Sequence, residues 1–223
     1  MSQFSFLSSQ IENSKKDSKS TDVILSASSM FTGICSKNFW LPDSCKVQEI
    51  GQPRNDIYFH DESFKNQLRK KYGFDTELKI LLYAPTFRDD NSINGYFTEF
   101  QELKQSLESC FREKWLVILR THENAGKLAS NIKYDDSVIN GTFFPDAQEL
   151  SVISDALITD YSSIMADFFI MKKPVFLYVK DLEQYNERSR GLRQIFYELP
   201  VTYSKNIDEL KTKIGRASCR ERV

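Results

Sequence analysis

Residues 156–178 read ALITDYSSIMADFFIMKKPVFLY, and this stretch decides the fold class. It opens with a short apolar run, ALIT, and closes with a second one, PVFLY, and both are typical of buried strands. Between them, apolar residues at positions 164, 165, 168 and 169 have the spacing of a helix. A strand, a helix and a strand in this order predict two parallel strands joined by a crossover helix.

The same alternation extends toward the N-terminus. Further strands are predicted at residues 23–26, 46–50, 79–83, 115–119 and 138–139, and further helices at 29–40, 61–72, 97–112 and 147–153. Continuous apolar strands separated by helices are typical of a parallel sheet that helices cover on both faces. The predicted fold class is therefore α/β, with a doubly wound parallel sheet.

The composition argues against several classes of protein. The chain of 223 residues has a net charge of −1, whereas nucleic-acid-binding domains are usually strongly basic, so no nucleic-acid partner is expected. No apolar run reaches the roughly 20 residues that a membrane-spanning helix needs. The four cysteines lack CxxC spacing and there are only two histidines. We therefore expect free thiols in a reducing compartment, with neither a metal site nor a cofactor.

Both ends of the chain are expected to lie outside the main domain. Residues 1–21 are polar and rich in serine and lysine, and they are interpreted as a linker or remnant of a preceding domain. Residues 214–223, IGRASCRERV, break the apolar pattern at Gly215 and resemble a translated sequencing adapter. We expect this tail to pack against nothing; the alternative is a native basic tail. The main domain then covers residues 22–213.

Four polar segments each follow a predicted strand directly, at residues 51–56, 85–90, 120–124 and 160–163. The carboxyl ends of parallel strands share one edge of a sheet, where ligands bind in open α/β folds. The segments supply Arg54, Thr86, Arg88, Arg120, Thr121, His122, Ser162 and Ser163. Guanidinium groups, hydroxyls and a helix N-terminus together predict a site for a phosphate or diphosphate.

Each of these residues also has a plainer interpretation. Ser162 could be only the N-cap of the helix at 162–171, and Arg54 could only stabilise a turn with Asp56. His122 is equally compatible with a structural role. Asp167, one helical turn after Ser163, could orient a ligand or pair locally. It is the combination of several loops that favours a ligand site.

The segments GQPRNDIYF, ILLYAPTFRDD, VILRTHEN and SDALITDYSSIMADFFIMKKPVFLYVKDLEQY, followed by RGL, resemble the CDP-glycerol glycerophosphotransferase family. The resemblance extends over residues 22–203 and rests on several motifs in the same order. It implies the C-terminal, Rossmann-like half of a two-domain GT-B enzyme that holds the donor nucleotide. It also implies transfer of glycerol phosphate from CDP-glycerol to a lipid-linked acceptor in teichoic-acid-type polymer synthesis. Such an enzyme acts in the cytoplasm, as a peripheral protein at the inner face of the membrane.

Carried across to this sequence, the resemblance implies a set of residues that line the donor site. These are Arg54, Pro85, Thr86, Arg120, Thr121, His122, Ser162, Ser163 and Asp167. His122 would be the catalytic member of the set, because a histidine beside the diphosphate can stabilise the charge that develops on the leaving CMP.

The sequence departs from the family pattern at one point. The family carries a WHG-type motif in its N-terminal half, whose histidine is the expected general base, and no histidine precedes His60 here. We therefore expect the N-terminal half to be largely missing and the chain to bind donor but to be inactive alone. Two alternatives remain open: a GT-B transferase that uses CDP-ribitol or a nucleotide sugar, and a non-catalytic nucleotide-binding module.

Overall fold

The computed structural model describes residues 3–88, 96–121, 132–188, 192, 194–199, 201 and 203–220, with the side chains of 3–8, 188, 194–195 and 218–220 excepted. The chain divides into two compact units, Met1–Asp56 and Ile57–Val223. This division lies well inside the range 22–213 that the sequence predicts as one domain. Each unit is described by itself.

The first unit contains two helices and two strands: α1 (Gln3–Ser18), β1 (Val23–Ser26), α2 (Ser29–Asn38) and β2 (Lys46–Glu49). The segment interpreted as a linker is thus largely helical. The Ser18 hydroxyl at the end of α1 lies between the carbonyl oxygens of Ser14 and Phe39, which ties α1 to the end of α2. Strands β1 and β2 pair in parallel and form a sheet of their own. The expectation that they belong to one large sheet is therefore wrong.

The second unit is built on a six-stranded sheet with the order β5-β4-β3-β6-β7-β8, in which all neighbours are parallel. The strands are β3 (Lys79–Ala84), β4 (Trp115–Leu119), β5 (Val138–Asn140), β6 (Ala156–Thr159), β7 (Val175–Tyr178) and β8 (Tyr203–Ser204). The predicted α/β class with a parallel sheet is confirmed. The two-residue strand β8 is too short to leave a pattern in the sequence.

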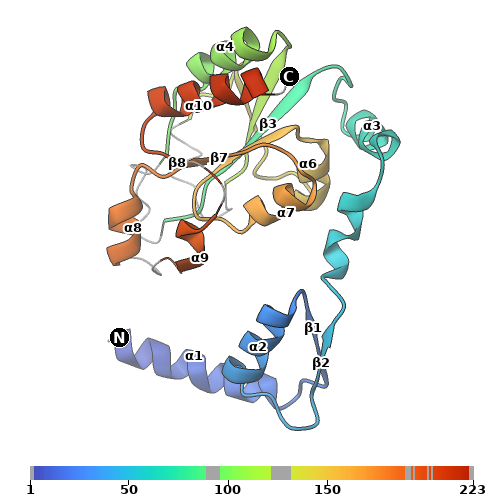
Figure 1. Ribbon diagram of the computed structural model, residues 1–223, viewed down its shortest axis with the longest axis vertical. Helices are drawn as coiled ribbons and strands as arrows, with labels where there is room; N and C mark the ends of the chain where they lie inside the picture. Colours follow the sequence, from blue (N-terminus) through green and yellow to red (C-terminus); the bar gives the residue numbers. More distant parts are fainter. Residues whose placement is uncertain are drawn as a thin grey trace. The chain divides into compact units, whose positions relative to one another are not determined.

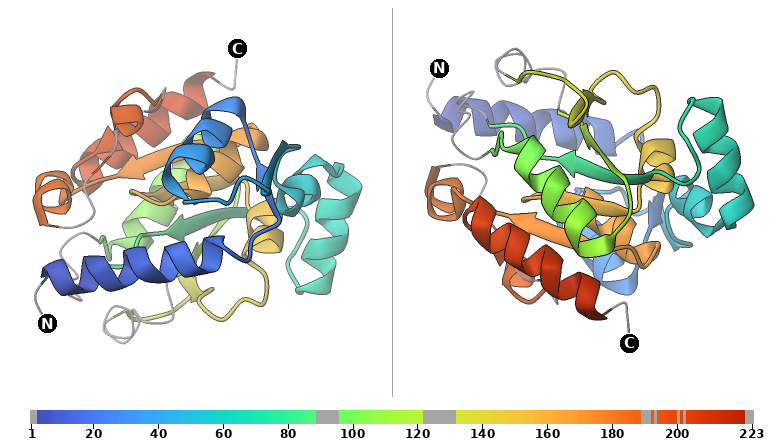
Figure 2. Two further views of the ribbon diagram at one scale, coloured as in Figure 1. Left: turned by 90° about the horizontal axis from the view of Figure 1, so that it is seen from below. Right: turned by 90° about the horizontal axis from the view of Figure 1, so that it is seen from above.

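Helices cover both faces of this sheet, as Figure 1 shows. α4 (Phe100–Phe111) and α10 (Ile207–Arg220) lie side by side on one face, and α6 (Ala147–Ile153) and α7 (Ile164–Ile170) lie on the other, with α3 (Glu62–Lys71) packed against α6. In both views of Figure 2, the arrows of the six-stranded sheet point away from α3. The unit also contains α8 (Leu182–Arg188) and α9 (Gln194–Tyr197), and η1 (Pro53–Phe59) spans the boundary between the units.

Strand β3 shows how the sheet separates two apolar cores. Leu81 and Tyr83 point into the core beneath α4 and α10, whereas Ile80 and Leu82 point into the core beneath α3, α6 and α7. Successive side chains of a strand point to opposite faces, and all four of these are almost completely buried. Burial of β3 on both faces of the sheet explains why its sequence, KILLY, is a continuous apolar run.

Helix α10 corrects the expectation for the C-terminal tail. Ile214 has no exposed surface and belongs to the core beneath α4, and Ala217 packs against the same core. With Leu210 they follow the helical spacing i, i+4, i+7, so the apolar stripe continues past Gly215. The expectation that the tail packs against nothing is wrong for its described side chains. A glycine weakens a helix by only ~1 kcal/mol, which tertiary packing overcomes.

Replacing Ile214 with alanine is therefore expected to lower the free energy of unfolding by about 2–5 kcal/mol, the usual range for such a cavity in a core. The measurement is urea denaturation followed by circular dichroism. The matched control is Gly215→Ala, because a Cβ there would meet only the Cys110 Sγ at 3.6 Å, an ordinary contact. That variant should be neutral or more stable by up to about 1 kcal/mol. An unchanged midpoint in Ile214→Ala would show that the tail does not belong to the fold.

Candidate functional site

The strand order of the second unit places a switch point between β3 and β6. From β3 the chain proceeds through β4 to β5 on one side, then returns to β6 on the other side and continues to β7 and β8. Ala84 and Thr159 are neighbours at the carboxyl ends of the two strands. Ligands of open α/β sheets bind in the crevice outside such a point. The segments that border it are residues 85–88 and 160–163.

Asp160 joins these two segments. Its side chain is only 2% exposed, and its Oδ1 accepts hydrogen bonds from the Thr86 N–H (2.8 Å), the Thr86 hydroxyl (2.6 Å) and the Tyr161 N–H (2.6 Å). The N–H and the hydroxyl of Thr86 are therefore both used in hydrogen bonds within the protein. The buried Pro85 lies between Thr86 and the end of β3.

Arg88 is the cation of this cluster, and it is 4% exposed. Its Nη2 donates to Asp160 Oδ2 (2.9 Å), and its Nε and Nη2 donate to the two carboxylate oxygens of Asp181 (2.6 and 3.0 Å). Its Nη1 donates to the Thr86 carbonyl at 2.7 Å. Burial alone would lower the pKa of Arg88, but the hydrogen bonds and charges of Asp181 and Asp160 raise it. Arg88 thus binds two carboxylates of the protein, whereas the sequence suggested a ligand phosphate.

Three tyrosine rings surround the guanidinium group of Arg88. The centroids of Tyr96, Tyr161 and Tyr185 lie 5.3, 5.1 and 5.1 Å from it, within the range of cation–π contacts. Tyr161 stacks on Tyr185 and donates its hydroxyl proton to Asp181 Oδ1 at 3.0 Å. Burial raises the pKa of Tyr96 to about 12, so its hydroxyl remains a donor to the Thr86 carbonyl.

Asp181 and the tyrosine rings are not among the site residues predicted from the sequence. Asp181 comes three residues after the predicted strand PVFLY, at the same edge as the other loops. Its position after a strand was the only signal for it, and the same signal selected the four polar segments.

Ser162 and Ser163 precede α7 at the switch point. The Ser162 hydroxyl oxygen accepts a long hydrogen bond of 3.4 Å from the Ile164 N–H, and Ser163 makes no side-chain cap. In the described part of the chain, the main-chain N–H groups of Ser162 and Ser163 donate no hydrogen bond. Two unused N–H groups at a helix start are suited to an anion. Asp167 is buried in the first turn of the same helix.

Arg120 and Thr121 follow β4 and support the turn after β5. Arg120 Nη1 donates to the carbonyls of Gly141 (3.0 Å) and Phe144 (2.9 Å), and the hydroxyls of Thr121 and Thr142 lie 3.0 Å apart. Gly141 is required there, because a Cβ would come within 2.5 Å of the Ile118 Cγ2. The two predicted site residues are thus one strand away from the switch point.

Two predicted site residues lie outside the described part of the six-stranded unit. His122 lies outside the described residues. Arg54 belongs to the first unit, where its Nε donates to Gln52 Oε1 at 2.9 Å. The strand before it, β2, is not part of the six-stranded sheet, so Arg54 does not follow one of its strands. The remaining set comprises Pro85, Thr86, Arg120, Thr121, Ser162, Ser163 and Asp167.

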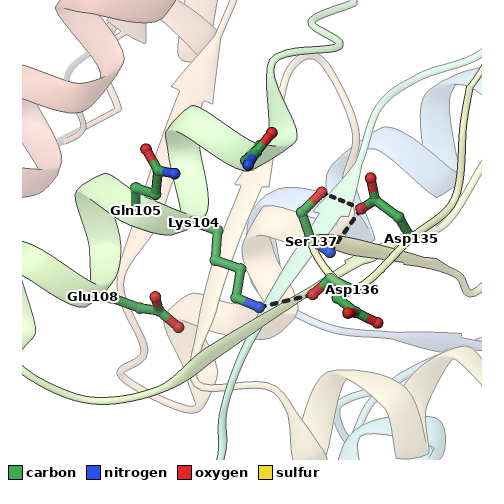
Figure 3. Close-up of a pocket in the computed structure, with 7 residues that line it drawn as sticks. Lys104, Gln105, Glu108, Asp135, Asp136 and Ser137 are labelled. Carbon is green, nitrogen blue, oxygen red and sulfur yellow. Dashed lines mark hydrogen bonds between the residues drawn. The ribbon is translucent and has the colours of Figure 1, made fainter.

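A separate pocket of about 380 Å³ lies between α4 and the segment before β5 (Figure 3). Its polar groups bind one another: Lys104 donates to the Asp136 carbonyl at 2.7 Å, and Asp135 accepts from Ser137. None of the predicted site residues lines it.

Among the residues that the structure describes, no group of three or more His, Cys, Asp or Glu side chains could hold a metal ion. Within the same residues, none of the helices combines the length and the apolar character required to cross a membrane.

Comparison with known proteins gives consistent matches. The family model for CDP-Glycerol:Poly(glycerophosphate) glycerophosphotransferase matches residues 2–222. A teichoic acid poly(glycerol phosphate) polymerase of Staphylococcus epidermidis is 31% identical over 192 residues, which cover 83% of this chain and 26% of the relative. A teichoic acid glycerol-phosphate transferase of Staphylococcus aureus is 32% identical over 212 residues, which cover 88% of this chain and 52% of the relative.

Solved structures of the wall teichoic acid polymerase TagF are also similar. One matches with a TM-score of 0.70 and 26% identity, over 94% of this chain and 54% of the other. A TagF variant soaked with CDPG matches with a TM-score of 0.70 and 27% identity, over the same shares of each chain. The chain thus spans about a quarter to a half of the length of these relatives.

Proposed function

The chain belongs to the CDP-glycerol:poly(glycerophosphate) glycerophosphotransferase family, and on this premise we propose that its six-stranded unit binds CDP-glycerol at the β3–β6 switch point. The observation that carries this proposal is the pair of unused N–H groups of Ser162 and Ser163 at that point. A diphosphate is the part of the donor that such groups bind best. The solved TagF variant soaked with CDPG supports this choice of ligand.

The complete protein would transfer glycerol phosphate to a lipid-linked acceptor during synthesis of a teichoic-acid-type polymer. An acceptor hydroxyl oxygen attacks the β-phosphorus of CDP-glycerol as its proton passes to a general base. The bond from that phosphorus to the oxygen shared with CMP breaks, and CMP leaves with the electron pair. His122 is proposed to stabilise the charge on the leaving CMP. This reaction would take place at the inner face of the cell membrane, where the lipid-linked acceptor is held.

A second donor, CDP-ribitol, is favoured by one comparison. A teichoic acid ribitol-phosphate primase of Bacillus spizizenii is 31% identical over 172 residues, which cover 74% of this chain. Relatives with glycerol and ribitol in their names thus have similar identity to this chain. Calorimetric titration with CDP-glycerol, CDP-ribitol and UDP-glucose separates the donors, because only the true donor should bind more tightly than CMP does.

Replacing Arg120 with alanine is expected to weaken CDP-glycerol binding by about 1.5–3 kcal/mol, the range for a charge-assisted hydrogen bond, or roughly 10- to 150-fold in Kd. The variant removes a cation at the ligand edge and also the support of the turn at Gly141. Isothermal calorimetry at low salt measures the effect.

Arg216→Ala serves as the control, because Arg216 is exposed on α10 and its loss changes the net charge by the same amount. It should leave the affinity unchanged. If Arg120→Ala binds CDP-glycerol as tightly as the control does, Arg120 has no part in the donor site.

A further inference from the structure

We propose that Asp181, in the loop after β7, is a positioning residue of the donor site. The inference rests on the proposed function and extends it to a residue outside the predicted set. Asp181 acts through Arg88 and Tyr161, and it holds the loop that presents the N–H groups of Ser162 and Ser163.

The contacts of Asp181 fix its two neighbours. Its Oδ2 accepts from Arg88 Nε at 2.6 Å, and its Oδ1 accepts from Arg88 Nη2 and from the Tyr161 hydroxyl, both at 3.0 Å. The two bonds to Arg88 form a bidentate pair, which defines the orientation of both groups. The Asp181 side chain is 12% exposed and Arg88 5%, so water competes little for these bonds.

Tyr161 is thereby held at both ends. Its hydroxyl donates to Asp181, and its main-chain N–H donates to Asp160 Oδ1 at 2.6 Å. Asp160 is itself held by Arg88, the partner of Asp181. Two routes therefore lead from Asp181 to the residue that immediately precedes Ser162. A binding group must be held to within about 0.5 Å to be effective, and supporting contacts of this kind provide that precision.

Charge alone predicts the opposite effect, which makes the inference testable. Asp181 is an anion near the proposed site of an anionic diphosphate. If Asp181 acted only through its charge, its neutralisation would remove a repulsion and tighten binding. If it acts by positioning, Asp181→Asn weakens binding although the site becomes less negative.

Asp155 provides a matched control at the other end of the same sheet. It directly precedes β6, accepts from Arg69 (2.7 Å), Lys65 (2.9 Å) and the Ile80 N–H (2.8 Å), and its side chain is 13% exposed. Asp155→Asn removes the same charge from a comparable cluster of bonds. A general loss of stability would affect both variants, whereas a positioning effect is confined to Asp181.

The experiment is calorimetric titration of this chain with CDP-glycerol, at a temperature well below the thermal midpoint of each variant. Asp181→Asn should weaken binding about tenfold or more, a loss like that seen when a residue that orients a metal ligand is replaced. Asp155→Asn should change Kd less than about twofold. Tyr161→Phe, which removes only the hydroxyl bond to Asp181, should weaken binding by a smaller factor, and it carries the test if Asp181→Asn does not fold.

If a folded Asp181→Asn variant binds CDP-glycerol as tightly as the unsubstituted chain, or more tightly, this inference is overturned but the proposed function is not. The same conclusion follows if Asp155→Asn weakens binding as much as Asp181→Asn does. If Asp181→Asn does not fold, unchanged binding by Tyr161→Phe overturns it. Absence of binding by the unsubstituted chain overturns the proposed function, and this inference with it.

Discussion

Replacing Arg69 with methionine should lower the free energy of unfolding by about 3–5 kcal/mol, the usual loss when one partner of a buried ion pair is removed. Arg69 is 2% exposed and lies in α3. Its guanidinium group donates to the carbonyls of Ile153, Thr76 and Leu78 and to Asp155 Oδ2. Methionine fills much of the same volume but leaves all four acceptors without this donor.

Urea denaturation measures the effect, with Lys71→Met as the control. Lys71 lies in the same helix and pairs with Glu149, but its side chain is 54% exposed. An exposed pair of this kind contributes less than ~1 kcal/mol. Similar losses in the two variants would show that the buried position of Arg69 has no special role.

The helix that carries Arg69 could be predicted from sequence, but its contacts could not. The helix predicted at 61–72 has local signals at both ends: Asp61 Oδ1 accepts from the Phe64 N–H at 3.0 Å, and Gly73 follows the helix with a φ of 73°. Such signals are local. Ile153 and Asp155 are more than eighty residues away from Arg69, and no local pattern specifies them.

The candidate site, too, could be predicted from the sequence only in part. Because adjacent parallel strands end at one edge, the segments after β3, β4 and β6 could be predicted to share it, and the strand pairing confirms this for the described residues 85–88, 120–121 and 160–163. The segment at 51–56 follows a strand of the separate two-stranded sheet, and an apolar run does not reveal which of two sheets a strand joins. Residue type also suggested an anion ligand for Arg88, but the carboxylates that bind it come from two distant loops.

The apolar stripe of α10 can be read from the sequence, but it extends beyond Gly215, where the sequence predicts its end. Leu210, Ile214 and Ala217 have helical spacing, and Gly215 lies between them on a different face. A glycine within a helix is only a weak signal for its end. The packing of Ile214 in the core beneath α4 outweighs that weak local signal.

Replacing Arg88 with methionine is expected to lower the free energy of unfolding by about 3–5 kcal/mol, because two carboxylates then lack their cation. Asp160 and Asp181 are 2% and 12% exposed, so water cannot fully replace the guanidinium group. The tyrosine rings around Arg88 also lose their cation–π contacts. Unfolding in urea provides the measurement.

A double-mutant cycle with Asp181→Asn tests whether these losses come from one coupled cluster. In the double variant, one of the two carboxylates that would lose their cation after Arg88→Met is already neutral, so part of the penalty is absent. The double variant should therefore lose less stability than the sum of the two single variants, with a difference of about 1 kcal/mol or more for groups in direct contact. Arg88→Met combined with Asp155→Asn is the reference, since those residues lie at opposite ends of the sheet and their effects should add within about 0.5 kcal/mol. Additive losses in both pairs would mean that Arg88 and Asp181 stabilise the unit independently, and that the bidentate bond between them contributes little.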